Sequence, residues 1–145
     1  MSKIEIQKIV EKMNLKNLTP DVGLADKYVE VPDINRPALQ LTGFFDHFDA
    51  ERVQIIGYVE YTFLEQMDEA TKIKVYETLL AYKIPCIIFC RALKPDQELL
   101  EKAQELDVPI FSTEMKTSAF TAELIRWLNV QLAPCISIHG VLVDV

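Results

Sequence analysis

The chain has 145 residues, half of them apolar, with 22 acidic residues against 15 basic ones and a formal net charge of -7. This length suits one domain with one core rather than two domains. Because the basic residues are scattered along an acidic chain, we expect neither nucleic acid nor an anionic membrane as a partner. The charged start MSKIEIQKIVEKMN is unlike a signal peptide, and no later segment approaches the ~18 apolar residues that cross a bilayer, so we expect a cytoplasmic protein.

The first expected element is a helix over about residues 3 to 14. Ser2 and Glu5 have the spacing of a capping box, and an apolar stripe follows on one helical face: Ile6, Ile9, Val10 and Met13. Turn-forming residues come next. They lead to a short strand, Tyr28 to Val31, which Pro32 ends.

The middle of the chain predicts a strand and two helices. Residues 53 to 56, VQII, form a brief strand that ends at Gly57, and residues 59 to 67 carry helix formers. Asp68 is placed to cap the next helix. That helix extends to about Tyr82 and has an apolar stripe at helical spacing: Ile73, Tyr76 and Leu80.

From Ile84 onward the chain repeats one unit twice: an apolar run opened by a β-branched residue and Pro, then a helix. In the first unit IPCIIFC leads to a helix with Pro95 near its first turn, and Asp96 and Glu98 favour its positive end. The residues of this helix that we expect to be buried are Leu99, Ala103 and Leu106.

In the second unit VPIFST leads to a helix capped near Thr117 or Ser118, whose inward residues are Phe120, Leu124, Trp127 and Leu128. Continuous apolar strands between amphipathic helices require a parallel sheet that is covered on both faces. The crossovers between such strands are right-handed. We therefore predict an α/β fold, a three-layer-like domain with a largely parallel sheet flanked by helices.

The three cysteines, Cys86, Cys90 and Cys135, are an odd number in a chain that we expect to be intracellular, which argues against a disulfide framework. Cys86 and Cys90 lie on one apolar run, where strand spacing would separate them by about 13 Å. One metal ion cannot be held by both. We therefore expect buried thiols that act as small hydrophobic side chains.

Pro134 stops the last helix, and CISIHGVLVDV begins as a strand or hairpin. Left unpaired, its apolar run Val141 to Val143 would form an open strand edge. A natural domain seldom ends in such an edge, so we expect the chain to stop at an artificial boundary. The tail from Cys135 onward should be loosely held or should pair between chains.

Three segments resemble one family, the HPr kinase/phosphorylases. The first is VPDINRPALQLTGFFDHFDAERVQIIG (Val31 to Gly57), which looks like the hallmark of the family's N-terminal domain. The second is IPCIIFCRALKPDQELLEKAQELDVPIFST (Ile84 to Thr113), which is similar to its strand-helix-strand unit, and the third is APCISIHGVLVDV (Ala133 to Val145), which resembles the beginning of its catalytic domain. The likeness covers essentially the whole chain in the right order. It implies an N-terminal α/β domain over residues 1–132 and the start of the catalytic P-loop domain at 133–145.

The resemblance implies a bacterial enzyme that phosphorylates a serine of the phosphocarrier HPr with ATP or pyrophosphate and Mg²⁺, and removes that phosphate by phosphorolysis. Its products would feed carbon catabolite repression. It also implies a homohexamer, an N-terminal domain similar in fold to the N-terminal domain of the Mur ligases, and a C-terminal domain with a P-loop. No G-x-x-x-x-G-K-[ST] occurs here, and the four glycines lie too far apart to build one: Gly23, Gly43, Gly57 and Gly140. We therefore expect this chain alone to be inactive and to hold no cofactor of its own.

The resemblance suggests one catalytic residue, His139 in IHGVLVDV. It matches a family active-site position close to the transferred phosphate, where it would donate a charge-assisted hydrogen bond or adjust the protonation of its neighbours. The residues alone favour a histidine that orders a turn before Gly140. Cys135 stands where the family often has a different residue, so the contacts just before His139 stay open.

His47 lies between Asp46 and Asp49, so a metal site is conceivable. Strand or turn geometry rarely aims three such neighbours at one point. We therefore interpret the segment as an exposed polar turn framed by three core phenylalanines: Phe44, Phe45 and Phe48.

Asp33, Asn35 and Arg36 resemble the polar loop after the first strand of the family, and Arg36 before Pro37 has the chemistry to bind an anion through two hydrogen bonds. A comparable loop in Mur ligases helps to hold a uridine nucleotide. The alternative, which we prefer, is that Asp33 and Asn35 close a turn while Arg36 pairs with a neighbouring carboxylate.

Two functions remain in competition. The first is a non-catalytic domain that assembles and modulates the catalytic ring of an HPr kinase/phosphorylase. The second is a stand-alone regulatory module with a Mur-ligase-like fold that binds a small ligand, a nucleotide or a phosphorylated metabolite, through Arg36. An enzyme complete in these residues lacks any nucleophile-base pair or metal cluster that we can place.

Overall fold

The structure, a computed structural model, describes residues 2–133, which fold around a five-stranded sheet. Its strands run in the order β2-β7-β6-β5-β4, and all are parallel except β2, which is antiparallel to β7. In chain order they are β2 (Lys16–Asn17), β4 (Ile34–Asn35), β5 (Val53–Ile56), β6 (Ile87–Phe89) and β7 (Ile110–Ser112). The predicted α/β class with a largely parallel sheet is confirmed.

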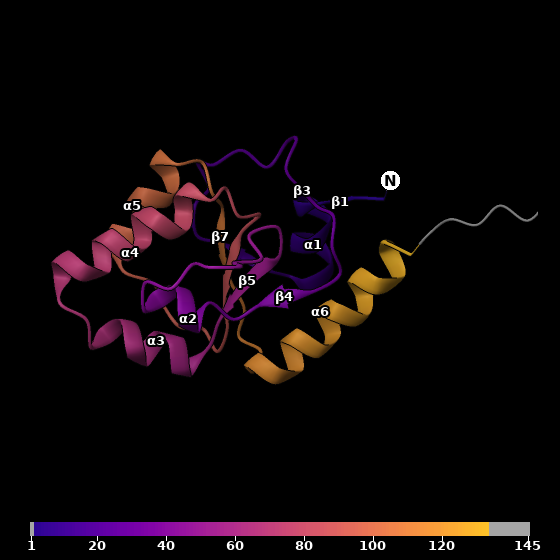
Figure 1. The fold of residues 1–145 in the computed structure, drawn as a ribbon. Helices are drawn as coiled ribbons and strands as arrows, with labels where there is room; N and C mark the ends of the chain where they lie inside the picture. The colour runs from indigo at the N-terminus through magenta and orange to yellow at the C-terminus, as the bar shows by residue number, and fades with distance from the viewer. Residues whose placement is uncertain (1, 134–145) are drawn as a thin grey trace, which may run out of the picture.

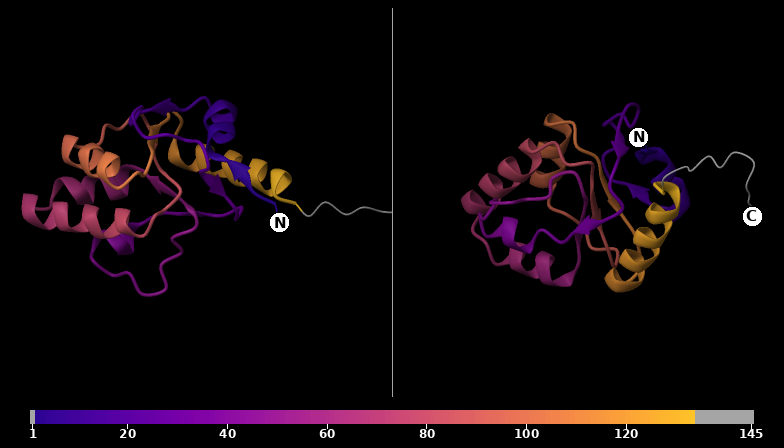
Figure 2. Two further views of the ribbon diagram at one scale, coloured as in Figure 1. Left: turned by 90° about the horizontal axis from the view of Figure 1, so that it is seen from above. Right: turned by 45° about the vertical axis from the view of Figure 1, so that its right-hand side comes forward.

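Helices cover both faces of this sheet, as Figure 1 shows. One layer holds α2 (Ala38–Leu41), α3 (Tyr58–Glu65), α4 (Glu69–Ala81) and α5 (Gln97–Glu105). The opposite layer holds α1 (Ile6–Met13) and α6 (Thr117–Gln131). Both views of Figure 2 show the same division. The predicted three-layer arrangement is therefore confirmed. None of the helices in residues 2–133 has the length and apolar character needed to cross a membrane.

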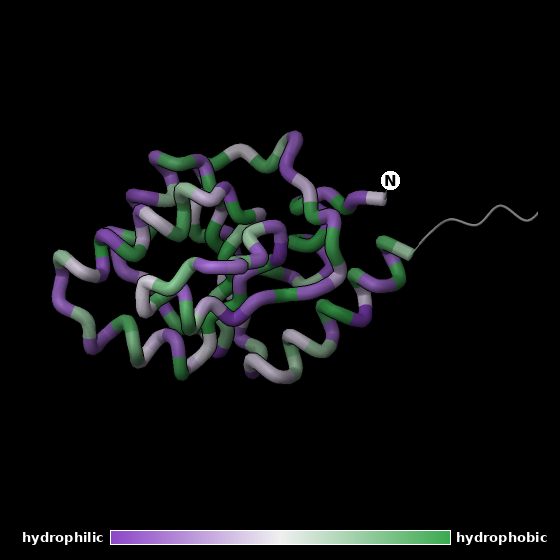
Figure 3. Tube along the Cα trace, in the orientation of Figure 1, coloured by the Kyte–Doolittle hydropathy of each residue, from purple (hydrophilic) through white to green (hydrophobic). Residues whose placement is uncertain are grey.

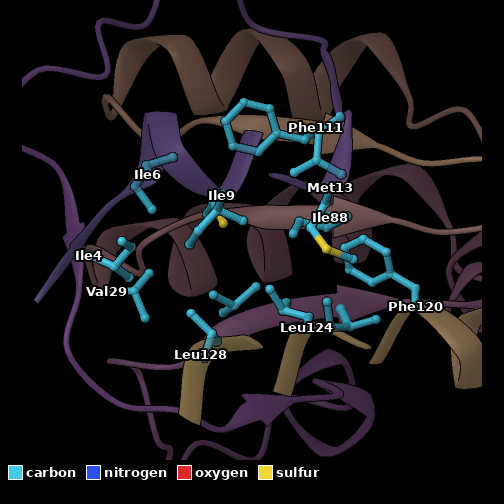
Figure 4. Close-up of a cluster of buried hydrophobic side chains, with 14 of the residues drawn as sticks. Ile4, Ile6, Ile9, Met13, Val29, Ile88, Phe111, Phe120, Leu124 and Leu128 are labelled. Carbon is cyan, nitrogen blue, oxygen red and sulfur yellow. The ribbon is translucent and has the colours of Figure 1, made fainter. Parts of the chain in front are cut away.

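The core has two parts because successive residues of each strand point to opposite faces of the sheet. Ile55 and Ile88 face the layer of α1 and α6, and Figure 4 shows the side chains of these two helices gathered around Ile88. Ile56 and Phe89 face the layer of α2 to α5. In the hydropathy colouring of Figure 3, green and purple alternate along the helices, as expected for elements that bury one side only.

Cys86 and Cys90 are free thiols buried in the first of these core parts, as predicted. Burial raises the pKa of Cys86 to about 12. Burial likewise raises the pKa of Cys90 to about 11, although the positive charge of the Arg36 guanidinium opposes the shift. Both thiols are therefore protonated near neutral pH and contribute as hydrophobic side chains.

The predicted start of the first helix is wrong. Ile4 and Glu5 form a strand, β1 (Ile4–Glu5), that pairs antiparallel with β3 (Tyr28–Val29). The helix begins only at Ile6, and no side chain caps it. The capping-box spacing is overridden because pairing with β3 satisfies the backbone there and buries Ile4 against Val29. The strand predicted for Tyr28 to Val31 is also shorter in the structure, where β3 covers Tyr28–Val29.

Other local predictions have mixed outcomes. The strand at residues 53 to 56 is confirmed as β5, and Asp68 caps α4 by accepting a 2.9 Å hydrogen bond from the Thr71 amide.

The predicted cap of α6 near Thr117 or Ser118 is wrong, because Lys116 precedes the helix and no side chain caps it. Several residues expected in the core are only half-buried, among them Ile73, Leu106 and Trp127.

A partly buried polar contact joins α4 to Asp96, the residue before α5. The Tyr76 hydroxyl donates to Asp96 Oδ2 at 2.5 Å, and the Lys72 ammonium lies 2.9 Å from the same oxygen. Burial alone would raise the pKa of Asp96, but these two hydrogen bonds outweigh it and hold the pKa below its usual range. The ionised carboxylate is thus the form that joins the helices.

Replacing Tyr76 with Phe should lower the free energy of unfolding by about 1–2 kcal/mol near neutral pH, because Asp96 loses a charge-assisted hydrogen bond. A carboxyl group with a lowered pKa stabilises the fold above its unfolded pKa, and this contribution is lost as the pH falls through the folded pKa. The cost of the substitution should therefore shrink in acid. Urea unfolding at neutral and acid pH measures it, with Tyr82→Phe as the control, since Tyr82 is 44% exposed. An equal cost at both pH values would contradict the assignment.

Candidate functional site

The carboxyl ends of β4, β5, β6 and β7 lie along one edge of the sheet because these strands are parallel. In open α/β sheets this is the edge at which ligands bind. Arg36, Gly57, Cys90 and Thr113 are the residues that directly follow the four strands. The candidate site is therefore sought among them and the helices that begin beside them.

Arg36 forms a two-point ion pair with Glu60 on the first turn of α3. Its Nε donates to Glu60 Oε2 at 3.0 Å, and its Nη2 donates to Oε1 at 2.8 Å. Glu60 Oε1 also accepts a hydrogen bond from the Gly57 amide at 2.8 Å, which is the half of a capping box in which the N3 carboxylate binds the N-cap amide. The side chain of Glu60 is only 3% exposed, whereas that of Arg36 is 40% exposed. The neighbouring carboxylate that the sequence suggested for Arg36 is thus Glu60.

The side chains of Arg36 and Thr117 lie close to the backbone of Gly57. An added Cβ at this position would lie 2.5 Å from Thr117 Oγ1 and 2.9 Å from Arg36 Nη2. Thr117 Oγ1 is buried without a hydrogen-bond partner within residues 2–133. These four residues, Arg36, Gly57, Glu60 and Thr117, form what we call the Arg36 cluster. It joins β4, β5 and the first turns of α3 and α6.

Asn35 does not close a turn, contrary to our expectation. It lies in β4, and its side-chain amide donates to Gln54 Oε1 at 2.7 Å and to Gln40 Oε1 at 3.2 Å. Gln54 in turn donates to the Arg52 carbonyl at 2.8 Å. This chain of amides, largely shielded from water, positions the residue before Arg36. Asp33 is exposed and lies 3.9 Å from Arg52 Nη2.

Arg91, just beyond β6, is a second cation near this edge. Its guanidinium stacks on the Tyr58 ring, 4.6 Å from the ring centroid. Arg91 and Ala92 both have positive φ angles, 60° and 55°, and their amides donate to the carbonyls of Met115 and Thr113. The loop after β6 is therefore tied to the loop after β7.

His47 is exposed in a turn with a φ of 60°. Within residues 2–133 no group of acidic, histidine and cysteine side chains is arranged to hold a metal ion. Phe45 and Phe48 pack against the core as expected, whereas Phe44 is 48% exposed because it lies outside the aromatic cluster that those two form with Tyr82. His139 and Cys135 lie outside the described residues.

Sequence reasoning missed Glu60, although a sign of it was present. Gly57 followed three residues later by Glu60 has the spacing of a helix N-cap and its N3 acceptor, directly after a predicted strand. The Arg36 cluster offers one cation, which is paired with Glu60, and one hydroxyl at the carboxyl edge of the sheet. It places no nucleophile beside a general base among the described residues.

Comparison with known proteins identifies the family of this chain and several relatives. The sequence model described as HPr serine kinase N terminus matches residues 4–128. An HPr kinase/phosphorylase of Lachnoclostridium phytofermentans is 53% identical over 145 residues, which are all of this chain and 47% of that protein. The HPr kinase/phosphorylase of Caldicellulosiruptor bescii is 39% identical over 140 residues, 97% of this chain and 45% of that protein. The chain thus spans about half the length of the curated relatives it matches.

Among solved structures, the regulatory region of Clostridium perfringens pyrophosphatase is similar, with a TM-score of 0.51 and 15% identity. The match covers 90% of this chain and 47% of that one, which comprises CBS and DRTGG domains complexed with the activator diadenosine tetraphosphate. At this identity the likeness concerns the fold alone. Similarity to the Mur ligases stays a prediction. The family match over residues 4–128 decides the assignment: this chain belongs to the HPr serine kinase N-terminal family.

Proposed function

We propose that this chain is the N-terminal, non-catalytic domain of a bifunctional HPr kinase/phosphorylase. The whole protein would phosphorylate a serine of HPr with ATP or pyrophosphate and Mg²⁺, and would remove the phosphate by phosphorolysis. The observation that carries the proposal is the 53% identity over all 145 residues to a relative of that name, which is about twice as long. Residues 1–132 would form the domain, and residues 133–145 would begin the catalytic one.

The chemistry of phosphoryl transfer supports this division of labour. The reaction needs a loop of backbone amides and a lysine that grip the phosphates, with Mg²⁺ to neutralise the developing charge. The 145 residues contain no G-x-x-x-x-G-K-[ST]. We propose that this domain instead assembles and positions the catalytic domains, in a cytoplasmic homohexamer.

That Arg36 binds an anion remains a prediction. In the structure its guanidinium is already paired with Glu60. Nε and Nη2 already donate to Glu60, so an anion would have to compete with a buried carboxylate. This condition weighs against the second function, a regulatory module that binds a small ligand through Arg36.

The proposal is tested by comparing the 145-residue chain with the product of the complete reading frame in an assay of ³²P transfer from ATP to HPr. We expect transfer by the complete protein and none above a no-protein blank by the 145-residue chain. The control is the complete protein with its P-loop lysine replaced by Ala, which should also be inactive. Turnover by the 145-residue chain, or a reading frame without a P-loop, would overturn the proposal.

The same assay examines His139, which we propose as an active-site residue of the complete protein. Replacing it by Ala in that protein should slow phosphoryl transfer while the circular dichroism spectrum stays the same, because the phosphate loses a hydrogen-bond donor. Unchanged kinetics would remove His139 from the active site.

A further inference from the structure

A hollow at the carboxyl edge of the sheet lies beside β7 and β2, and none of its lining residues belongs to the Arg36 cluster. It has a volume of about 870 Å³. Cavities of about 300–1,000 Å³ accommodate small organic ligands. We call it the edge cavity. Its apolar wall is formed by Met13, Leu18, Leu93, Pro95, Leu100 and Met115.

The polar lining of the edge cavity is biased toward positive charge. Lys16 and Lys94 line it against one carboxylate, that of Glu114, in a chain with more acidic than basic residues. Among the described residues no carboxylate oxygen lies within 4.0 Å of either ammonium group. Lys16 is directly opposite Ser112 in the β2–β7 pair, so their side chains are neighbours on one face. A hydroxyl donor thus lies beside a cation without an ionic partner.

The walls of the edge cavity are held in place before any ligand arrives. The Ala92 amide donates to the Thr113 carbonyl at 2.8 Å, and the Met115 amide donates to Thr113 Oγ1 at 3.2 Å. On the other side, the Tyr61 hydroxyl donates to the Lys94 carbonyl at 2.7 Å. A site with pre-ordered walls loses little conformational entropy on binding.

We propose that the edge cavity binds a small organic anion. The apolar body of the ligand lies against the wall of methionine, leucine and proline side chains, and its anionic group lies near Lys16 and Lys94. The apolar wall supplies affinity by burial, and the two cations select for charge. The site is separate from the Arg36 cluster, and it does not depend on the kinase assignment.

The test uses two fluorescent probes with the same kind of aromatic body: 1-anilinonaphthalene-8-sulfonate, an anion, and N-phenyl-1-naphthylamine, its uncharged counterpart. For the 145-residue chain we expect saturable binding of one sulfonate probe per chain, about tenfold tighter than the neutral probe. In Lys16→Gln/Lys94→Gln this preference should disappear. The matched control is Lys74→Gln, which removes an exposed lysine of α4, away from the cavity, and should keep the preference.

A second variant fills the cavity without changing charge. Ser112→Phe places a large side chain on a half-buried strand position that lines the cavity, and it should weaken binding of both probes. Amide NMR spectra establish that each variant is folded, and probe-induced shifts should centre on Ser112, Thr113 and Met115. If Ser112→Phe does not fold, the lysine pair decides alone.

Three results would overturn the proposal: no saturable binding, equal affinity for the two probes in the native chain, or the same loss of preference in Lys74→Gln. Inorganic phosphate adds a further arm, because it has the charge and lacks the apolar body. We expect it to displace the sulfonate probe only weakly. Displacement by phosphate at concentrations similar to the probe would indicate general anion attraction and would also count against the site.

Discussion

Replacing Arg36 with Met is expected to lower the free energy of unfolding by about 2–3 kcal/mol. The substitution removes two hydrogen bonds from Glu60, whose side chain is only 3% exposed, and among residues 2–133 it leaves that carboxylate with the Gly57 amide as its remaining donor. Breaking a buried ion pair at one end costs about 3–5 kcal/mol. The expectation here is lower because Arg36 itself is 40% exposed. Urea unfolding near neutral pH measures the change.

Arg52→Met is the matched control for this prediction. Arg52 has a side chain of similar exposure, 34%, but its carboxylate partners Asp33 and Asp49 are 58% and 50% exposed and lie 3.9 and 3.6 Å away. Pairs exposed to this extent contribute less than about 1 kcal/mol. If both arginine substitutions lower the free energy of unfolding equally, the burial of Glu60 does not determine how much the Arg36–Glu60 ion pair stabilises the fold. The double variant Arg36→Met/Glu60→Leu should recover part of the loss, since no buried charge remains.

Replacing Gly57 with Ala is expected to cost about 2 kcal/mol through overpacking. The φ angle of Gly57 is −112°, which any residue adopts, so no backbone strain is involved. The new methyl carbon would lie 2.5 Å from Thr117 Oγ1 and 3.1 Å from Thr117 Cγ2, and both atoms belong to a short side chain on the first turn of α6. Thermal or urea unfolding reports the loss.

A second substitution identifies the cause of that loss. Thr117→Ala removes two of the three close contacts and leaves Arg36 Nη2, the end of a longer side chain that can shift, so Gly57→Ala should cost less in the Thr117→Ala background than in the native chain. Gly23→Ala is the control, because an added Cβ at Gly23 has no neighbour within 4 Å. Additive effects of the two substitutions would show that the close contact at Thr117 is not responsible.

Sequence reasoning succeeded where an element is long or strongly patterned. The strand at residues 53 to 56 and the helix capped by Asp68 emerge directly from apolar runs and capping chemistry. It failed for two-residue strands such as β2 and β4, which are too short to show a period. At the N-terminus the local preference of Ser2 and Glu5 was overruled by pairing of β1 with β3, a contact between segments distant in sequence.

The candidate site was predictable in kind but not in detail. A carboxylate partner for Arg36 follows from the chemistry of an arginine beside a buried strand, but that it is Glu60 depends on how α3 leaves β5. The edge cavity was beyond sequence reasoning because four separated stretches of chain contribute to it: residues 13–18, 92–95, 100 and 112–115. Only the packing of β2 beside β7 brings them together.

The pairing of β2 with β7 has a consequence for synthesis of the protein on the ribosome. Lys16 emerges early, whereas its partner Ser112 is added near the end of the described chain. The β4–β5, β5–β6 and β6–β7 pairs join segments much closer in sequence and can form as they emerge. Strand β2 therefore stays unpaired, with its backbone groups hydrogen-bonded to water, until β7 has been synthesised. Nascent chains that stall before β7 would present an incomplete sheet to chaperones and proteases.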